Sequence, residues 1–189
     1  MPPKSINYTG EMRLYSADGN RYYLNETERA RFLEAAQALP AMARVFCLTL
    51  VYTGCRISEA RFLRRGEEQL QEKRIAFKPL KRRDKGHVRE VPIPEALVRE
   101  FLRLHFVDIH VQDEWLFSDD SEPPPRISCY RWVKSAMATA GIEGEKACPK
   151  GLRHGYGVHA TKSGVQLHML QKWMGHAHMT TTAIYATAM

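Results

Sequence analysis

The chain has 189 residues, of which 44% are hydrophobic and 26% are charged, as is ordinary for a folded globular protein. This length is typical of one domain with short extensions, and no apolar run of roughly 18 residues indicates a membrane span. Lysine and arginine number 28 against 21 aspartates and glutamates, which gives a net charge of +7. Clustered basic residues favour a polyanionic partner, although a basic globular protein without such a partner can have the same charge.

The cysteines give no sign of an oxidising compartment. Four are present, none forms a CxxC pair, and residues 1–19 lack the apolar core of a signal peptide. We therefore expect a cytoplasmic protein without disulfides.

In chain order, residues 1–23 are polar and rich in turn formers, and we expect them to form an arm. Residues 24–40 read as a helix, with Asn25 as its N-cap and Glu28 completing a capping box. We expect the domain proper to span residues 24–189.

The spacing of apolar residues along the chain then changes twice. Residues 41–54 are apolar on most sides, which predicts a buried helix that ends at Gly54. Residues 73–81 and 87–94 are strand-like and are joined by a basic turn, which predicts an antiparallel hairpin. Other helices are expected at 57–66, 95–106 and 127–141, with three short ones after residue 149. The predicted class is α+β, mainly helical, with a small sheet of about three antiparallel strands.

The stretch "TGCRISEA" places Arg56 after a helix-ending glycine and at the start of the next helix. Helix N-termini favour anions, and a guanidinium adds a planar pair of donors that matches phosphate oxygens. Alternatively, Arg56 is a surface residue paired with Glu59 one turn further on.

A second cationic stretch, "PKGLRHGYGVHA", places Lys150, Arg153 and His154 at a predicted helix start. Lys150 and Arg153 are three residues apart and therefore share a helix face. The alternative is a solvated basic turn.

The C-terminal stretch "GHAHMTTTAIY" places His176 nine residues before Tyr185. Tyr185 is either a core aromatic or a reactive phenol, and His176 is either a helix cap or a ligand of the reacting group. The five histidines after residue 150 have no pair at i, i+4 spacing and no nearby acidic or cysteine ligand, so we expect no metal site.

Taken together, these groups suit phosphoryl transfer. Arginines and lysines can stabilise a pentavalent phosphate without a metal, and a tyrosine can attack phosphorus to form a covalent phosphotyrosine.

In this order, the motifs resemble those of the tyrosine recombinases of the phage integrase family, over roughly residues 20–189. The resemblance implies that family's catalytic-domain fold. It also implies a site-specific recombinase that cuts and rejoins DNA through a 3′-phosphotyrosyl intermediate, without cofactor, metal or ATP. The matching catalytic positions are Arg56, Glu59, Lys150, Arg153, His176 and the nucleophile Tyr185.

The general acid of the family is a lysine of the hairpin, which we assign to Lys81, with Lys85 in the turn as the alternative. Several basic residues are expected to contact double-stranded DNA: Lys78, Arg82, Arg83, Lys85, Arg131, Lys134 and His154. The expected protein is a monomer without DNA and a tetramer on paired DNA sites.

The sequence departs from the family pattern at Lys150, where a histidine is usual. A lysine donates to a phosphate oxygen but is a poor base unless burial lowers its pKa. The resemblance does not include the family's usual N-terminal DNA-clamping domain, and we expect only a short arm in its place, as in the minimal recombinases. Two other activities stay open: relaxation of DNA in the manner of a type IB topoisomerase, and DNA binding by a non-catalytic regulator.

Overall fold

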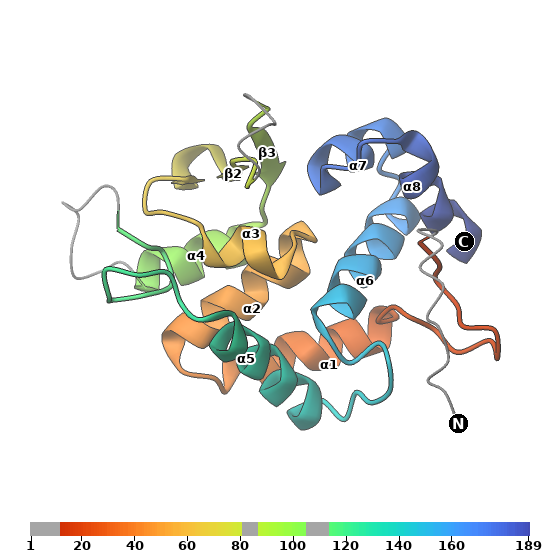
Figure 1. Cartoon of the computed structure of the whole chain (residues 1–189), viewed down its shortest axis with the longest axis horizontal. Coiled ribbons are helices and arrows are strands. Elements are labelled where there is room, and N and C mark those ends of the chain that lie inside the picture. The colour runs from red at the N-terminus through yellow and green to blue at the C-terminus, as the bar shows by residue number, and fades with distance from the viewer. Residues whose placement is uncertain (1–11, 81–86, 105–113) are drawn as a thin grey trace, which may run out of the picture.

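The computed structural model describes residues 12–80, 87–104 and 114–189. They form a mainly helical domain with one three-stranded antiparallel sheet, which confirms the predicted class (Figure 1). No helix within these ranges has the length and apolar character needed to cross a bilayer. The elements are α1 (Glu26–Gln37), α2 (Ala41–Thr53), α3 (Ile57–Arg61), β1 (Glu68–Gln69), η1 (Leu70–Glu72), β2 (Arg74–Phe77), β3 (Arg89–Pro92), α4 (Glu95–Leu104), α5 (Arg126–Thr139), α6 (Pro149–Lys162), α7 (Leu167–Met174), α8 (Met179–Ala183) and η2 (Ile184–Ala188).

Helix α2 is the centre of the main hydrophobic core. Nine of its 13 residues are buried, and it packs against α1, α4, α5 and α6. It ends at Gly54, whose φ of 64° lies in the left-handed region. The buried helix that the sequence predicted is confirmed, with its C-cap at the expected glycine.

Helix α1 begins with the predicted capping box. Asn25 Oδ1 accepts from the Glu28 N–H at 2.8 Å, and Glu28 Oε2 accepts from the Asn25 N–H at 2.9 Å. The Glu28 carboxylate also binds Arg21 at 2.8 Å and Lys146 at 2.7 Å. One buried carboxylate thus joins α1 to the segment before it and to the loop that leads into α6.

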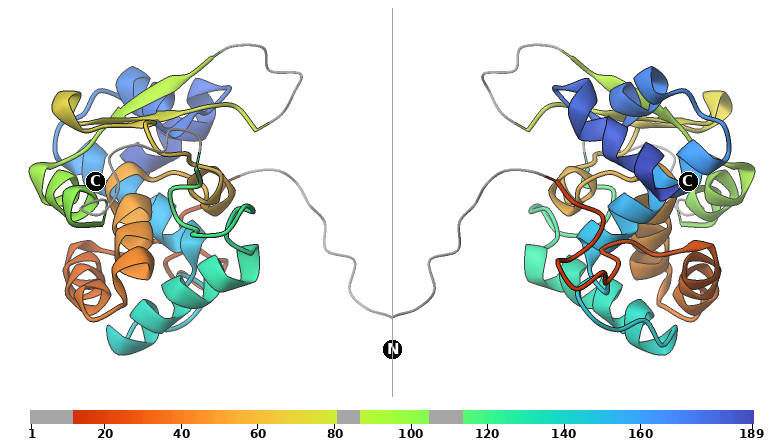
Figure 2. Two further views of the ribbon diagram at one scale, coloured as in Figure 1. Left: turned by 90° about the vertical axis from the view of Figure 1, so that its left-hand side faces the viewer. Right: turned by 90° about the vertical axis from the view of Figure 1, so that its right-hand side faces the viewer.

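The sheet has the order β1-β2-β3, and Ile75 and Val91 are partners across its longer pair. This confirms the predicted hairpin. β2 and β3 lie on either side of residues 81–86 in the chain, and these residues lie outside the described ranges. They include Lys81, Arg82, Arg83 and Lys85. Figure 2 shows the strands of the hairpin at the upper end of the molecule, beside the C-terminal helices.

The C-terminal part forms a second, smaller hydrophobic cluster around α6. In Figure 1, α6 lies between α1 and α2 on one side and α7 and α8 on the other. Tyr156, Leu170, Met174 and Tyr185 are buried in this cluster, together with Leu14 from the N-terminal segment. The three short helices predicted after residue 149 are α6, α7 and α8, and the chain then continues into the 3₁₀ turn η2, which carries Tyr185.

Candidate active site

Arg153 lies in the first turns of α6 with its guanidinium buried. Nη1 donates to the Gly54 carbonyl at 2.6 Å, and Nη2 donates to the Met174 carbonyl at 2.8 Å. These carbonyls lie at the C-terminal ends of α2 and α7, where helices leave acceptors unsatisfied and carry partial negative charge. Burial, followed by the charge of Arg56, lowers the pKa of Arg153 to about 10, so the guanidinium stays charged at neutral pH.

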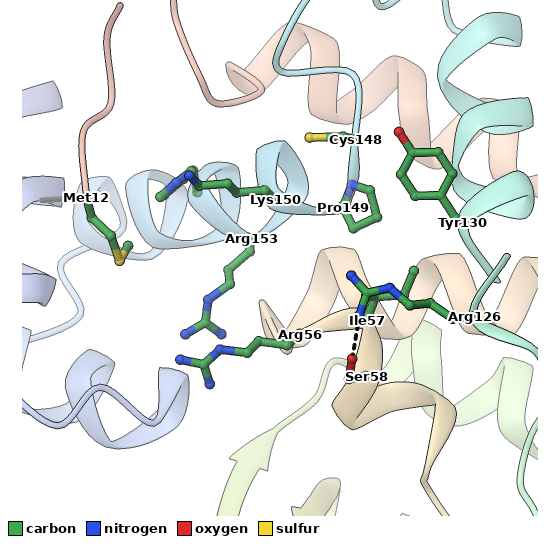
Figure 3. Close-up of a pocket in the computed structure, with 11 residues that line it drawn as sticks. Met12, Arg56, Ile57, Ser58, Arg126, Tyr130, Cys148, Pro149, Lys150 and Arg153 are labelled. Carbon is green, nitrogen blue, oxygen red and sulfur yellow. Dashed lines mark hydrogen bonds between the residues drawn. The ribbon is translucent and has the colours of Figure 1, made fainter. Parts of the chain in front are cut away.

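Arg56 is the N-cap residue of α3, and half of its side chain is exposed, at 51%. Its N–H donates to Glu59 Oε2 at 2.7 Å, and its Nη1 donates to Glu59 Oε1 at 3.3 Å. Figure 3 shows the guanidinium groups of Arg56 and Arg153 side by side in the space between α3 and α6. The pairing with Glu59 that the sequence suggested is therefore present, and it leaves Arg56 open on the side that faces Arg153.

Glu59 also binds Arg89, a residue of β3 that the sequence analysis did not single out. Arg89 Nη1 and Nη2 donate to the two carboxylate oxygens at 2.8 Å each, and Arg89 Nε donates to the Trp173 carbonyl at 2.7 Å. Burial raises the pKa of Glu59, but the hydrogen bonds and charge of Arg89 outweigh burial and leave the pKa below its usual value. The sequence could have indicated that Glu59 has such a partner, because a carboxylate at a buried helix start requires a cationic group to pair with it.

Tyr185 is fully buried, with 0% of its surface exposed. Its Oη lies 3.2 Å from His154 Nδ1, and its ring stacks on that of His176 at 6.3 Å between centroids. The ring also lies directly over Gly157, where a Cβ would come within 2.5 Å of Tyr185 Cε1 and Cζ. Burial raises the pKa of Tyr185 to about 12, although Arg153 and Arg56 oppose the shift, so the phenol is neutral.

Two buried histidines each leave one ring nitrogen unused. His176 Nδ1 lies 2.9 Å from Thr182 Oγ1, and His154 Nδ1 faces Tyr185. Among the described residues, neither Nε2 atom has a hydrogen-bond partner. Burial, followed by nearby positive charge, lowers the pKa of His154 to about 4 and that of His176 to about 3. Both rings are therefore neutral and able to donate or accept a hydrogen bond.

Two cavities meet at Arg56. A cavity of about 570 Å³ is lined by Lys150, Arg153 and His154 of α6 and by Arg126 of α5 (Figure 3). A second cavity of about 720 Å³ lies toward the hairpin and α7 and includes Arg89. An anion placed beside Arg56 would meet cationic groups from several elements at once.

The structure therefore brings together six of the seven predicted catalytic residues. The six are Arg56, Glu59, Lys150, Arg153, His176 and Tyr185. Lys81 and its alternative Lys85 lie outside the described residues. Arg126, which lines the first cavity and donates to Ser58 Oγ at 2.9 Å, was not predicted.

The predicted DNA contacts are placed less uniformly. Arg131 and Lys134 lie exposed on α5, with Lys134 Nζ donating to the Ala147 carbonyl at 2.7 Å, and Lys78 pairs with Glu67 at 2.8 Å. His154 is only 1% exposed and faces Tyr185, so its ring lies inside the site and not on the outer surface. Arg82, Arg83 and Lys85 lie outside the described residues.

This helical frame, with a buried tyrosine beside arginines and histidines, has the fold of tyrosine recombinase catalytic domains. The profile of the phage integrase family matches residues 22–189, and the chain belongs to this family.

Named relatives are similar over much of the chain. The type 1 fimbriae regulatory protein FimB of Escherichia coli (strain K12) is 29% identical over 174 residues, which cover 89% of this chain and 85% of FimB. A tyrosine recombinase of Thermosipho africanus is 29% identical over 140 residues, which cover 72% of this chain and 46% of that protein. The crystal structure of the XerH site-specific recombinase in a post-cleavage complex with palindromic difH substrate superimposes with a TM-score of 0.73 and 26% identity, over 87% of this chain and 49% of that one. The chain thus spans about half the length of the latter two and most of FimB.

Proposed function

We propose that residues 24–189 form the catalytic domain of a site-specific DNA recombinase. Tyr185 attacks a phosphodiester, forms a 3′-phosphotyrosyl link and releases a 5′-hydroxyl. Attack by a second 5′-hydroxyl then reverses the step on a new partner strand. The observation that carries this proposal is the convergence of the Tyr185 phenol, two arginines and two neutral histidines on one site.

The arginines suit the charge that develops on phosphorus. Arg153 is already fixed by two carbonyls, so its remaining donors need no reorganisation when a phosphate arrives. Arg56 is half exposed and oriented by Glu59, which fits a residue that closes on the same phosphate from the open side.

His176 and Lys150 complete the group that would hold the phosphate. His176 Nε2 is a buried, unpaired group beside the tyrosine, and a phosphate oxygen would satisfy it. Lys150 is exposed and lines the cavity that also contains Arg153. An ammonium group there adds positive charge and up to three donors.

For the general acid we propose Lys81, which the family resemblance assigns to the hairpin, and we keep Lys85 as the alternative. Lys81→Ala should slow cleavage severely on an ordinary duplex. A substrate with a better 5′ leaving group should restore the rate, because such a group leaves without a proton. If the better leaving group restores cleavage by Lys85→Ala and not by Lys81→Ala, the general acid is Lys85 in the turn.

As partner we propose double-stranded DNA, with a monomer in its absence, a tetramer on paired sites, and action in the cytoplasm where the DNA lies. The basic cavities at Arg56 support a polyanionic ligand, and XerH was crystallised with its difH substrate. Sedimentation of the chain alone and with paired-site duplexes tests the assembly. A stable tetramer without DNA would contradict it.

The test of the reaction is covalent trapping. The protein is incubated in the presence of chelator with nicked suicide duplexes taken from the DNA beside its own gene, and the products are separated on a denaturing gel. We expect a protein–DNA band that disappears in Tyr185→Phe while DNA binding persists. A band in the Tyr185→Phe variant would contradict the nucleophile, and relaxation of supercoiled DNA without recombinant products would favour the topoisomerase-like reaction.

A further inference from the structure

Attack by Tyr185 requires an acceptor for the phenolic proton, and the structure places one. His154 Nδ1 lies 3.2 Å from Tyr185 Oη and is the only hydrogen-bond partner recorded for that oxygen among the described residues. Building on the proposed function, we propose that His154 is a catalytic residue that takes the proton from Tyr185 during cleavage and returns it during religation.

Lys150 is poorly suited to this role. Its side chain is exposed, and an ammonium group has donors but no acceptor. His154 lies four residues further along α6, and positions i and i+4 lie on the same face of a helix. A base at position 154 therefore lies one helical turn from the place where the family usually has a histidine.

The state of the His154 ring is compatible with accepting a proton. Its pKa of about 4 keeps the ring neutral at physiological pH, so one nitrogen is an acceptor. Nδ1 is that acceptor when the proton lies on Nε2. In the described structure, this Nε2 is buried without a partner, which is an unfavourable position for an N–H group.

A bound phosphate would resolve this conflict. His154 lines the 570 Å³ cavity together with Lys150 and Arg153. A phosphodiester oxygen in that cavity would accept from Nε2–H, which favours the tautomer with a free Nδ1. Binding of the substrate would thus favour the tautomer in which His154 can accept the proton.

The same phosphate would also supply the missing negative charge. Among the described residues, the ionisable groups that face His154 are Lys150 and Arg153 on α6, Tyr185 on η2, His176 between α7 and α8, and Arg56 before α3, and none of these is a carboxylate. Without an anion, an imidazolium in this place is disfavoured by burial and by positive neighbours. Proton transfer therefore awaits the DNA.

The step is balanced in atoms and charge. A lone pair of Tyr185 Oη forms the bond to phosphorus while the phenolic proton moves to His154 Nδ1. The bond from phosphorus to O5′ breaks, and O5′ leaves with its electron pair and takes a proton from the general acid of the proposed function. Religation reverses each transfer.

The experiment is single-turnover cleavage of a nicked suicide duplex by the full chain at a series of pH values, with DNA affinity measured separately. We expect His154→Gln to slow cleavage by about 10²-fold or more while the affinity changes only a few-fold. The wild-type rate should level off once the imidazole is neutral. The variant rate should instead continue to rise toward about pH 12, the pKa of the buried phenol, because Tyr185 then has to ionise by itself.

Two matched comparisons separate chemistry from structure. His154→Ala should regain activity with added imidazole, which a purely structural defect would not do, and Lys150→Ala should lose rate while keeping the wild-type pH profile. The proposal is overturned if Lys150→Ala and not His154→Gln changes the pH profile, or if His154→Gln cleaves within about 3-fold of wild type.

A measurement on the wild-type protein covers the case in which the variants fail to fold. Nitrogen NMR of the DNA-bound chain should show His154 with its proton on Nε2, and a proton on Nδ1 would overturn the assignment. Absence of any covalent product with the wild-type chain would overturn the proposed function itself, and with it this inference. That outcome differs from loss of cleavage in a His154 variant alone.

Discussion

Glu59 and Arg89 together join three segments of the chain, α3, β3 and α7. Glu59 accepts from the Arg56 N–H at the start of α3 and from both Nη atoms of Arg89 on β3. Arg89 in turn binds the Trp173 carbonyl of α7 and lies 4.8 Å from the centroid of the Phe77 ring. The position of Arg56 thus depends on the hairpin and on α7, although neither is adjacent to it in sequence.

Glu59→Gln should lower the free energy of unfolding by roughly 2–4 kcal/mol, because it leaves the Arg89 guanidinium, whose side chain is only 13% exposed, without its negative partner. Urea denaturation measures this. The control is Glu95→Gln, which breaks a pair with Lys73 in which both side chains are more than half exposed, and which should change the free energy of unfolding far less. Equal effects of the two substitutions would contradict the structural role of Glu59.

The two buried histidines predict a dependence of stability on pH. The pKa of each is lower in the folded chain, at about 4 for His154 and about 3 for His176, than the ordinary value near 6.5. The unfolded chain therefore binds more protons below about pH 6.5, and stability falls as the pH drops toward these folded values. Each histidine contributes at most about 1.4 kcal/mol per pH unit.

Unfolding by urea at pH 7.5 and pH 5.0 checks this expectation. The difference in the free energy of unfolding between the two pH values should be smaller in His176→Gln, and smaller again when His154→Gln is added. A wild-type chain that is equally stable at both pH values would contradict the burial of neutral imidazoles.

At the scale of elements, α6 both carries residues of the site and packs closely against Tyr185. Arg153 and His154 point to the site, while Gly157, one turn on, lies against the Tyr185 ring. A glycine inside a helix is unfavourable by itself, so its presence here is explained by the space that the ring requires.

Gly157→Ala should therefore displace Tyr185 and reduce both stability and cleavage, despite the better helix propensity of alanine. In a Tyr185→Ala background, the same substitution should instead stabilise the chain by up to about 1 kcal/mol. A double-mutant cycle of unfolding free energies measures this change of sign. Additive effects would show that the ring does not rest on this glycine.

How far the sequence predicts the structure depends on the range of the interactions. The caps of α1 and α2 were predictable because Asn25, Glu28 and Gly54 act on backbone groups within a few residues. The 3₁₀ turn that carries Tyr185 and the partnership of Glu59 with Arg89 were not, because both depend on packing between segments far apart in the chain. The catalytic motifs gave the residue types of the site but not the position of His154, whose neighbour is 31 residues away.

At the scale of the whole molecule, charge should govern affinity for DNA. The net charge of +7 and the basic cavities around Arg56 predict binding that weakens steeply with salt, since phosphate contacts release counterions. Fluorescence anisotropy over a salt series should show that Arg126→Ala lowers the slope of log K against log salt by about 0.9. Arg103→Ala is the control, because this exposed arginine of α4 lines neither cavity and should leave the slope unchanged. A DNA affinity that does not change with salt would contradict the proposal that charge governs binding.

Tyr185, the proposed nucleophile, belongs to a small satellite of the core, in which it is packed with Leu170, Met174 and Tyr156. Burial of an aromatic ring stabilises a fold by roughly 1.5–3 kcal/mol. Any movement that carries the Tyr185 ring out of this cluster forfeits part of that energy for as long as the DNA stays attached. Rejoining the strand returns the phenol to its pocket and recovers it. In the proposed reaction, the fold itself would thus favour rejoined DNA and would shorten the lifetime of the cut strand.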